Sequence, residues 1–358
     1  RSSDLVDAAA AALAKIEAYN NGDGTTPAAL TVTDYQAAGV TGVNTDNVAA
    51  VNANVLAQSA GGADTVDDVQ ALANAVNNAL AKIEAYNNGD GITPSALAVQ
   101  DYVNAGITGV NASNLVAVNA QVLAQSTGGA DSCAEVQALV TAASNALAKI
   151  EAYNNGDGTT PAALTLADYQ AAGITGVSTD NLGAVNAKVL AQSTGGADTV
   201  SDVQTLVNAV NTAITKVEAY NNGDGVTPSA LTAQDYADAG VSGVSSANLA
   251  AVNAQVFAQN AGGADSVGEI QALVTAANNA LAKIEAYNNG DGTTPVALTV
   301  ADYQAAGITG VSSDNLAAVN AKVLAQSTGG ADAVSEIQNL VNAANAALAK
   351  IEGDRKSV

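Results

Sequence analysis

The sequence has no histidine, methionine or tryptophan and only one cysteine, and its two arginines are Arg1 and Arg355. Histidine and cysteine are the side chains that most often act as general bases and nucleophiles, so the usual catalytic groups of an enzyme are missing. Carboxylates are present, but they recur at predicted helix starts and turns, where capping explains them. We therefore predict that the protein is not an enzyme, has no catalytic residue and requires no cofactor.

Basic residues are also scarce, because 11 lysines and arginines stand against 34 acidic residues and leave a net charge of −23. Nucleic-acid binding depends largely on basic side chains that neutralise phosphates, so the composition argues against a nucleic-acid partner. No apolar run approaches the ~20 residues that span a bilayer, and no signal-peptide pattern opens the chain, so we expect no membrane insertion. Because the chain begins at Arg1 without a methionine, we expect a fragment or a processed product.

The feature that the sequence has in abundance is internal repetition. The letters Ala-Tyr-Asn-Asn-Gly-Asp-Gly begin at Ala18 and return 67 residues later at Ala85, and then again with the same spacing. A fixed period of this length is typical of a repeat array, in which each unit needs its neighbours to complete its core. The predicted divisions are a truncated repeat over 1–63, full repeats over 64–130, 131–197, 198–264 and 265–331, and a terminal helix with a tail over 332–358.

Each period opens with a long amphipathic pattern, which predicts a helix from about Val66 to Tyr86. Thr65 or Asp64 is a suitable N-cap, and Asp68, three residues after Thr65, completes a capping box. The arrangement recurs as Ser132 with Glu135, Thr199 with Asp202, and Ser266 with Glu269. The single cysteine, Cys133, stands where other copies have valine, so we interpret it as a small buried hydrophobic residue.

Two shorter helices are predicted in the rest of the period. The first is capped by Thr31 with Asp34 and ends at Gly39, and the second is capped by Asn44 and runs to about Gln58. Its apolar side is predicted to carry Val48, Val51, Val55 and Leu56. The two-residue alternation of a strand is missing throughout.

The predicted fold is therefore all-α, and we expect an α-solenoid of tandem 67-residue three-helix repeats. The alternative is a row of separate three-helix bundles. No linker rich in proline, serine or charge separates the copies, and the loops keep their lengths from copy to copy. These observations favour stacked repeats.

Two kinds of polar residue recur on the predicted core faces. Asn52 lies one turn from Val48, so we expect it to be partly buried and to make a structural hydrogen bond. Tyr19 and Tyr35, with their counterparts, account for all ten tyrosines. We interpret them as residues at the edge of the core, with a hydroxyl in water or on a carbonyl. The roles of Gln58 and Gln70 stay open between structural bonds and a solvated surface.

The recurring Asn-Asn-Gly-Asp-Gly loop has two interpretations. It resembles the middle of the calcium loop of EF-hands, but the first and last ligand positions would fall on Tyr19 and Leu30, which are not carboxylates. A rearranged site would need Asn20, Glu17, Asp34 or carbonyl oxygens. The simpler interpretation is a turn and a helix cap. The candidate calcium residues are Asn21, Asp23, Asn88, Asp90, Asn155, Asp157, Asn222, Asp224, Asn289 and Asp291.

The amino-acid sequence of the repeat also resembles that of a known family. The run from Gly22 to Val43, followed by Asp46-Asn47-Val48-Ala49-Ala50-Val51-Asn52, resembles helical repeats in giant multi-repeat, adhesin-like surface proteins of Gram-negative bacteria. The resemblance covers essentially the whole chain. It implies an extracellular or cell-surface location and a spacer or matrix role.

From these observations we expect an extracellular structural protein, either a stalk or a self-assembling filament subunit. Its expected partners are other copies of itself or flanking repeats of a longer chain. The near identity of the copies favours a structural role, because a recognition protein usually varies its exposed positions. The alternatives are a solenoid that binds a protein or glycan, and an acidic array stiffened by calcium.

Overall fold

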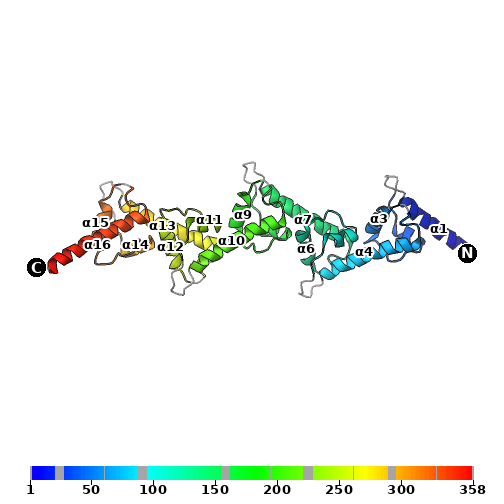
Figure 1. The fold of residues 1–358 in the computed structure, drawn as a ribbon, viewed down its shortest axis with the longest axis horizontal. Coiled ribbons are helices and arrows are strands. Elements are labelled where there is room, and N and C mark those ends of the chain that lie inside the picture. Colours follow the sequence, from blue (N-terminus) through cyan, green and yellow to red (C-terminus); the bar gives the residue numbers. More distant parts are fainter. Residues whose placement is uncertain are drawn as a thin grey trace. The chain divides into compact units, whose positions relative to one another are not determined.

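The computed structural model describes residues 2–20, 28–59, 61–87, 95–126, 128–154, 162–193, 195–220, 229–260, 262–288, 296–327 and 329–356. Every regular element in these ranges is a helix, and none of their residues forms a strand. The predicted all-α class is therefore confirmed. Sixteen helices follow one another in the described part of the chain (Figure 1).

The helices fall into three lengths that alternate along the chain. The long ones are α1 (Ser2–Tyr19), α4 (Val66–Tyr86), α7 (Cys133–Tyr153), α10 (Val200–Tyr220), α13 (Val267–Tyr287) and α16 (Val334–Lys356). The six-residue ones are α2 (Val32–Ala37), α5 (Val99–Asn104), α8 (Leu166–Ala171), α11 (Ala233–Asp238) and α14 (Val300–Ala305). The nine-residue ones are α3 (Val48–Leu56), α6 (Leu115–Leu123), α9 (Leu182–Leu190), α12 (Leu249–Phe257) and α15 (Leu316–Leu324).

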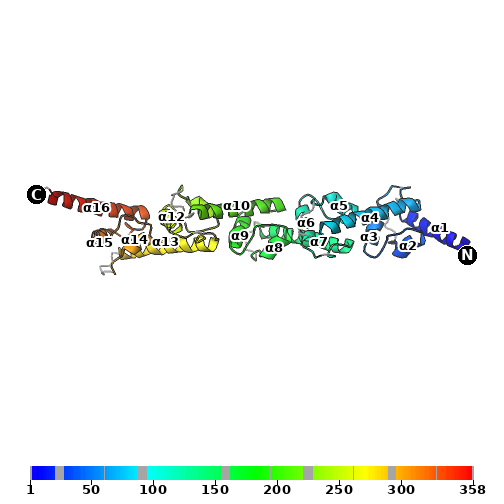
Figure 2. The ribbon, with the colours of Figure 1, turned by 90° about the horizontal axis from the view of Figure 1, so that it is seen from below.

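The chain divides into two compact units, which are Arg1–Thr175 with Gln192–Gln204, and Gly176–Ala191 with Thr205–Val358. In the first unit, α4 packs against α3 before it and α5 after it, and α7 packs in the same way against α6 and α8. In the second unit, α12 and α14 both pack against α13 (Figure 2). Each of these three long helices therefore packs against a nine-residue helix before it and a six-residue helix after it. The contact of α3 with α4 joins residues on the two sides of the predicted division between residues 63 and 64.

The helix starts agree with the predicted caps in most positions. Thr65 accepts a hydrogen bond from the N–H of Asp68, whose carboxylate accepts one from the N–H of Thr65. The pairs Ser132 with Glu135 and Thr199 with Asp202 do the same. In α13 the Ser266 side chain accepts a hydrogen bond from the N–H of Glu269, as predicted. The Glu269 carboxylate, however, accepts from the N–H of Asp265 rather than from that of Ser266.

The predicted cap of the nine-residue helix was misplaced. Asn44 does not cap α3, which begins four residues later at Val48. Its side-chain oxygen accepts hydrogen bonds from the N–H groups of Asp46 and Asn47, at 2.9 and 3.1 Å. Asn44 therefore holds the turn that leads into the helix.

The core consists of small aliphatic residues around tyrosine. Val51 and Val55 are buried as predicted, but Leu56 is 38% exposed, so its predicted place in the core was wrong. Successive residues of a helix are turned by about 100°, which rotates Leu56 away from the face of Val55. Its counterparts at Leu123, Leu190, Phe257 and Leu324 are exposed to a similar degree.

Candidate functional site

A buried tyrosine and asparagine form the most enclosed polar group of the repeat. The hydroxyl of Tyr102 in α5 donates to Oδ1 of Asn119 in α6 at 2.7 Å, and Nδ2 of Asn119 donates to the carbonyl of Leu97 at 2.9 Å. The same bonds join Tyr35, Asn52 and Leu30, then Tyr236, Asn253 and Leu231, and then Tyr303, Asn320 and Leu298. The predicted structural role of Asn52 and these counterparts is confirmed.

The interpretation of Tyr35 as a residue at the core edge was wrong. Tyr35 and Tyr102 are both 0% exposed. Their hydroxyls need no water because the asparagine amide satisfies them. Burial raises the pKa of the Tyr102 hydroxyl well above its usual range, and the nearby Tyr86 and Asp101 add to this effect. The hydroxyl therefore stays neutral at physiological pH and serves packing rather than acid–base chemistry.

A second polar cluster lies at the surface, where the end of each long helix meets the start of the next short helix. Lys15 in α1 places Nζ 2.6 Å from Oδ1 of Asp34 in α2. The other carboxylate oxygen accepts bonds from the N–H and the hydroxyl of Thr31, at 2.8 and 2.7 Å. The Lys15 bond, together with those from Thr31, lowers the pKa of Asp34 to about 2. Both carboxylate oxygens are already bonded, which makes Asp34 a poor candidate for a calcium ligand.

The same ion pair recurs at each junction of this kind. Its members are Lys82 with Asp101, Lys149 with Asp168, Lys216 with Asp235, and Lys283 with Asp302, all at 2.5 or 2.6 Å. In the second copy Ala98 replaces the capping threonine, but its N–H still donates to Asp101 at 2.8 Å. Burial raises the pKa of Asp101, but the bonds from Lys82 and Ala98 outweigh it, so the pKa is lowered.

We expect Asp34→Asn to lower the free energy of unfolding by about 1 kcal/mol at pH 7. The carboxylate has a lower pKa in the folded chain than the ~3.9 of an unfolded aspartate. Its contribution is therefore present above pH ~4 and is lost as the pH falls toward 2. Urea unfolding of the parent chain and the variant should show a difference at pH 7 that shrinks at pH 2.5. Asp7→Asn, on the exposed surface of α1, is the control, and a difference that persists at low pH would contradict this account.

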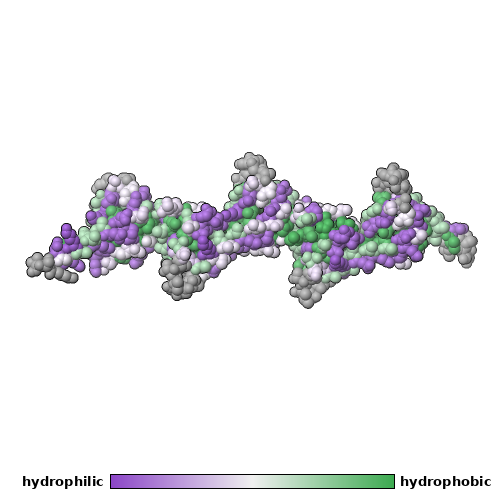
Figure 3. Space-filling model, in the orientation of Figure 1, coloured by the Kyte–Doolittle hydropathy of each residue, from purple (hydrophilic) through white to green (hydrophobic). Residues whose placement is uncertain are grey.

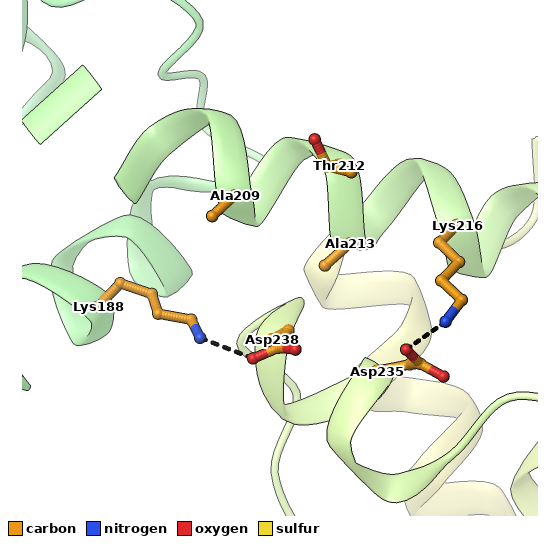
Figure 4. A pocket seen from close by; sticks show the side chains of 7 residues that line it. All are labelled: Lys188, Ala209, Thr212, Ala213, Lys216, Asp235 and Asp238. Atoms are coloured by element: carbon orange, nitrogen blue, oxygen red, sulfur yellow. Dashed lines mark hydrogen bonds and ion pairs between the residues drawn. The ribbon is translucent and has the colours of Figure 1, made fainter. Parts of the chain in front are cut away.

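A groove lies beside two of these ion pairs. In the first unit its volume is about 390 Å³, and it is lined by Ala75, Asn78, Ala79, Lys82, Asp101 and Asn104. In the second unit the equivalent groove, of about 400 Å³, has Ala209, Thr212 and Ala213 on its α10 side. Figure 4 shows its charged groups as two ion pairs, Lys216 with Asp235 and Lys188 with Asp238. The charges that line this groove are therefore neutralised by one another.

Glutamine side chains of the long helices form hydrogen bonds with the backbone of the turn that precedes each nine-residue helix. Oε1 of Gln70 accepts from the N–H of Thr41 at 2.8 Å, and Nε2 donates to the carbonyl of the same residue at 3.0 Å. The pattern recurs as Gln137 with Thr108, Gln271 with Ser242, and Gln338 with Thr309. The sequence left the role of Gln70 open, and the structure assigns it a structural bond between the long helix and this turn.

Several contacts link one copy of the repeat to the next within each unit. In the first unit, Nε2 of Gln121 in α6 donates to the carbonyl of Ala171 in α8 at 2.7 Å. In the second unit, Gln255 in α12 donates in the same way to Ala305 in α14. At Gly106, which has a φ of +72°, an added Cβ would lie 2.5 Å from the Cβ of Ala50 in α3. The nine-residue helix of one copy therefore lies against the end of the short helix of the next.

The remaining predicted residues fall in two places. Cys133 is 8% exposed, its thiol donates to the carbonyl of Ala105 at 3.4 Å, and burial raises its pKa, so the interpretation as a buried hydrophobic residue is confirmed. The ten candidate calcium residues, from Asn21 and Asp23 to Asn289 and Asp291, all lie outside the described residues. Within the described ranges, no three or more acidic, cysteine or histidine side chains gather as a metal site would require.

The bonds described in these clusters either cap a short helix, as between Thr31 and Asp34, or join one element of the fold to another. No helix in the described ranges is both long enough and apolar enough to cross a bilayer. Comparison with protein-family models, with curated proteins and with solved structures gave no match.

Proposed function

We propose that the protein is a non-catalytic structural array that acts as an extracellular stalk or spacer. The observation that supports this most is the use of its polar side chains. Lysine, aspartate, glutamine and asparagine recur in the described copies and bond to neighbouring helices and turns. A protein built to hold its own units in register needs these contacts, whereas a catalytic or binding site would direct such groups toward a ligand.

We further propose that the units form an α-solenoid of 67-residue three-helix repeats, in preference to separate bundles. Two observations support this arrangement. The nine-residue helices bond to the next copy's short helix through Gln121 and Gln255. In addition, the N–H of Cys133 donates to the carbonyl of Asp46 at 3.2 Å, which joins α7 to the turn before α3. Bundles on a string would lack bonds of this kind.

The proposed location outside the cell follows from the resemblance of the repeat sequence to that of adhesin-like surface proteins. The proposed partners are repeats of the same kind, either flanking ones or those of a second copy. Self-assembly into a filament would require a contact between molecules that does not close into a ring. Sedimentation at high protein concentration, with electron microscopy for fibres, distinguishes a filament subunit from a monomeric stalk.

Small-angle scattering of chains with different numbers of repeats tests the stalk. We expect each inserted copy of residues 131–197 to lengthen the particle by a constant increment. A compact globule of the same composition would instead show a radius of gyration that rises only as about the 0.38 power of chain length. A radius of gyration that rises with chain length only as this weaker power would contradict the proposal.

A binding module remains the second candidate, because one copy differs from the others at its surface. Val103 and Val116 in the second copy are 49% and 55% exposed. The counterparts of Val116 are alanine or glycine, and those of Val103 are glutamine or alanine. Hydrophobic surface is visible in the region of α6 and α7 (Figure 3). Loss of adhesion to a cell-surface ligand on Val116→Ala with Val103→Gln would favour this candidate.

The calcium alternative predicts a different response from the turn interpretation that we favour. We expect the unfolding midpoint to change by less than about 1 °C between millimolar calcium and excess chelator, because turns and caps need no metal. Circular dichroism at fixed ionic strength is the measurement, and equimolar magnesium is the control. A rise of several degrees with calcium, lost when Asp23 and its four counterparts are replaced by alanine, would instead establish a metal site.

A further inference from the structure

The contact between a nine-residue helix and the next short helix takes two chemical forms. In one form a glutamine, Gln121 or Gln255, donates to a backbone carbonyl at an alanine of the short helix. In the other form Lys188 in α9 pairs with Asp238 in α11 at 3.0 Å. Asp238 is the only aspartate at this position among the five short helices, whose other residues there are Ala37, Asn104, Ala171 and Ala305. In the third copy this contact is therefore an ion pair rather than a hydrogen bond to the backbone.

Two lysines attach α11 at both of its ends. Lys216 binds Asp235 at the start of the helix, and Lys188 binds Asp238 at its end (Figure 4). Beyond the helix, Gly240 has a φ of +80°, and an added Cβ there would lie 2.8 Å from the Cα of Ala184. This close approach fixes the helix end against α9, because only glycine fits there without a clash.

The same attachment surface occurs once more, on α15 and α16. Lys322 and Lys350 occupy the positions of Lys188 and Lys216, and Ala318 occupies the position of Ala184. Among the five nine-residue helices, α9 and α15 alone carry lysine here, since the others have Asn54, Gln121 and Gln255.

This second surface is open in the structure. Lys322 is exposed, whereas the side chain of Lys188 is 28% exposed. Ala184 is 2% exposed, but Ala318 is only half-buried. Ile351 is 64% exposed, whereas its counterpart Val217 in α10 is 0% exposed. Among the described residues, neither Lys322 nor Lys350 has an ion-pair partner. Apolar residues flanked by two such exposed lysines form a surface that a complementary segment would cover.

We propose that the surface formed by Ala318, Lys322, Lys350 and Ile351 docks a helical repeat whose short helix carries two aspartates in the pattern of Asp235 and Asp238. The inference rests on the proposed stacking of repeats and names the chemistry of the partner. Asp235 would meet Lys350, Asp238 would meet Lys322, and the glycine after the helix would lie on Ala318. The packing of α11 on α9 and α10 shows the same arrangement with its partner in place.

The N-terminal repeat of a second copy fits this surface less well. Its short helix, α2, offers Asp34 for Lys350 but presents Ala37 where Lys322 needs a carboxylate. In addition, Lys15 of α1 already binds Asp34. A head-to-tail filament of identical chains would therefore leave Lys322 without its counter-charge. The surface favours a repeat with both aspartates over the chain's own first repeat, which has one of them.

Extension of the chain tests this selectivity. The tail after Glu352 is replaced by a second copy of residues 219–263, which contains α11 and α12, and hydrogen exchange is followed at residues 345–352. We expect exchange there to slow by at least ~10-fold relative to the parent chain. Asp238→Ala in the extension should remove most of this protection, and so should Lys322→Ala. Lys322→Asp together with Asp238→Lys in the extension should restore it.

The matched control is an extension with residues 18–62, which contains α2 and its Ala37. Protection equal to that of the α11 extension, or no effect of Asp238→Ala, would overturn the proposed selectivity while leaving stacking intact. If neither extension protects residues 345–352, the stacking of repeats itself fails, and the proposed function fails with it.

Discussion

Asn119→Ala is expected to lower the free energy of unfolding of the second copy by about 3–5 kcal/mol. The substitution removes both hydrogen bonds of the amide and leaves the hydroxyl of Tyr102 and the carbonyl of Leu97 without partners. Tyr102 is 0% exposed, so water does not reach the hydroxyl in the folded state. Each buried polar group left unpaired costs about 1–3 kcal/mol, and the lost volume adds a cavity.

The measurement is urea unfolding combined with local hydrogen exchange, because a repeat array need not unfold in one step. Tyr102→Phe removes one donor and leaves only Oδ1 of Asn119 without its partner, so we expect a smaller cost of ~1–2 kcal/mol. In the Tyr102→Phe background, Asn119→Ala should be less damaging than in the parent chain. Asn104→Ala, at an exposed position of α5, serves as the surface control. Equal effects of Asn104→Ala and Asn119→Ala would refute the account of the buried amide.

Gly106→Ala is expected to destabilise the junction between the first and second copies by at least ~3 kcal/mol. Its φ of +72° is a conformation that alanine adopts at a cost of roughly 1–2 kcal/mol. The added Cβ would also lie 2.5 Å from the Cβ and 2.8 Å from the Cα of Ala50. The second contact is with backbone, so relief requires α3 and the α5 end to separate.

The chain contains a matched control for this substitution. Gly39 occupies the same position in the first copy and has a φ of +86°, but an added Cβ there meets no atom within 4 Å. Gly39→Ala should therefore show the backbone cost alone, roughly 1–2 kcal/mol. The difference between the two variants measures the contact between copies. Equal losses, measured by local hydrogen exchange at α3 and α5, would mean that the close approach contributes nothing.

The helices were predictable because their signals are local. The long helix from Val66 to Tyr86 was predicted from apolar spacing and the Thr65 cap, and the structure has these bounds. Leu56 and Asn44 were misjudged although the geometry that places them is local. Leu56 is apolar but follows a core residue by one position, and Asn44 caps a turn that sequence periodicity does not distinguish from a helix start.

The polar clusters were predictable only in part. The asparagine at position 52 stood out as an amide on an apolar face, but its partner could not be named, because Tyr35 lies 17 residues earlier and the intervening chain must turn back. The pairing of Lys82 with Asp101 and of Gln70 with Thr41 depends on the same geometry. The recurrence of these residues at a fixed spacing in every copy was the one sequence signal that indicated these bonds.

The packing of α4, α7 and α13 against one helix before and one helix after them has a consequence for synthesis of the chain. The described contacts within a copy join residues close in sequence, such as Lys82 with Asp101 and Tyr102 with Asn119. Low contact order of this kind favours fast folding. When α5 leaves the ribosome, α4 is already in place to receive it, since α4 is packed on α3. Each copy can therefore template the next in order of translation, which limits the misassembly to which near-identical neighbouring repeats are prone.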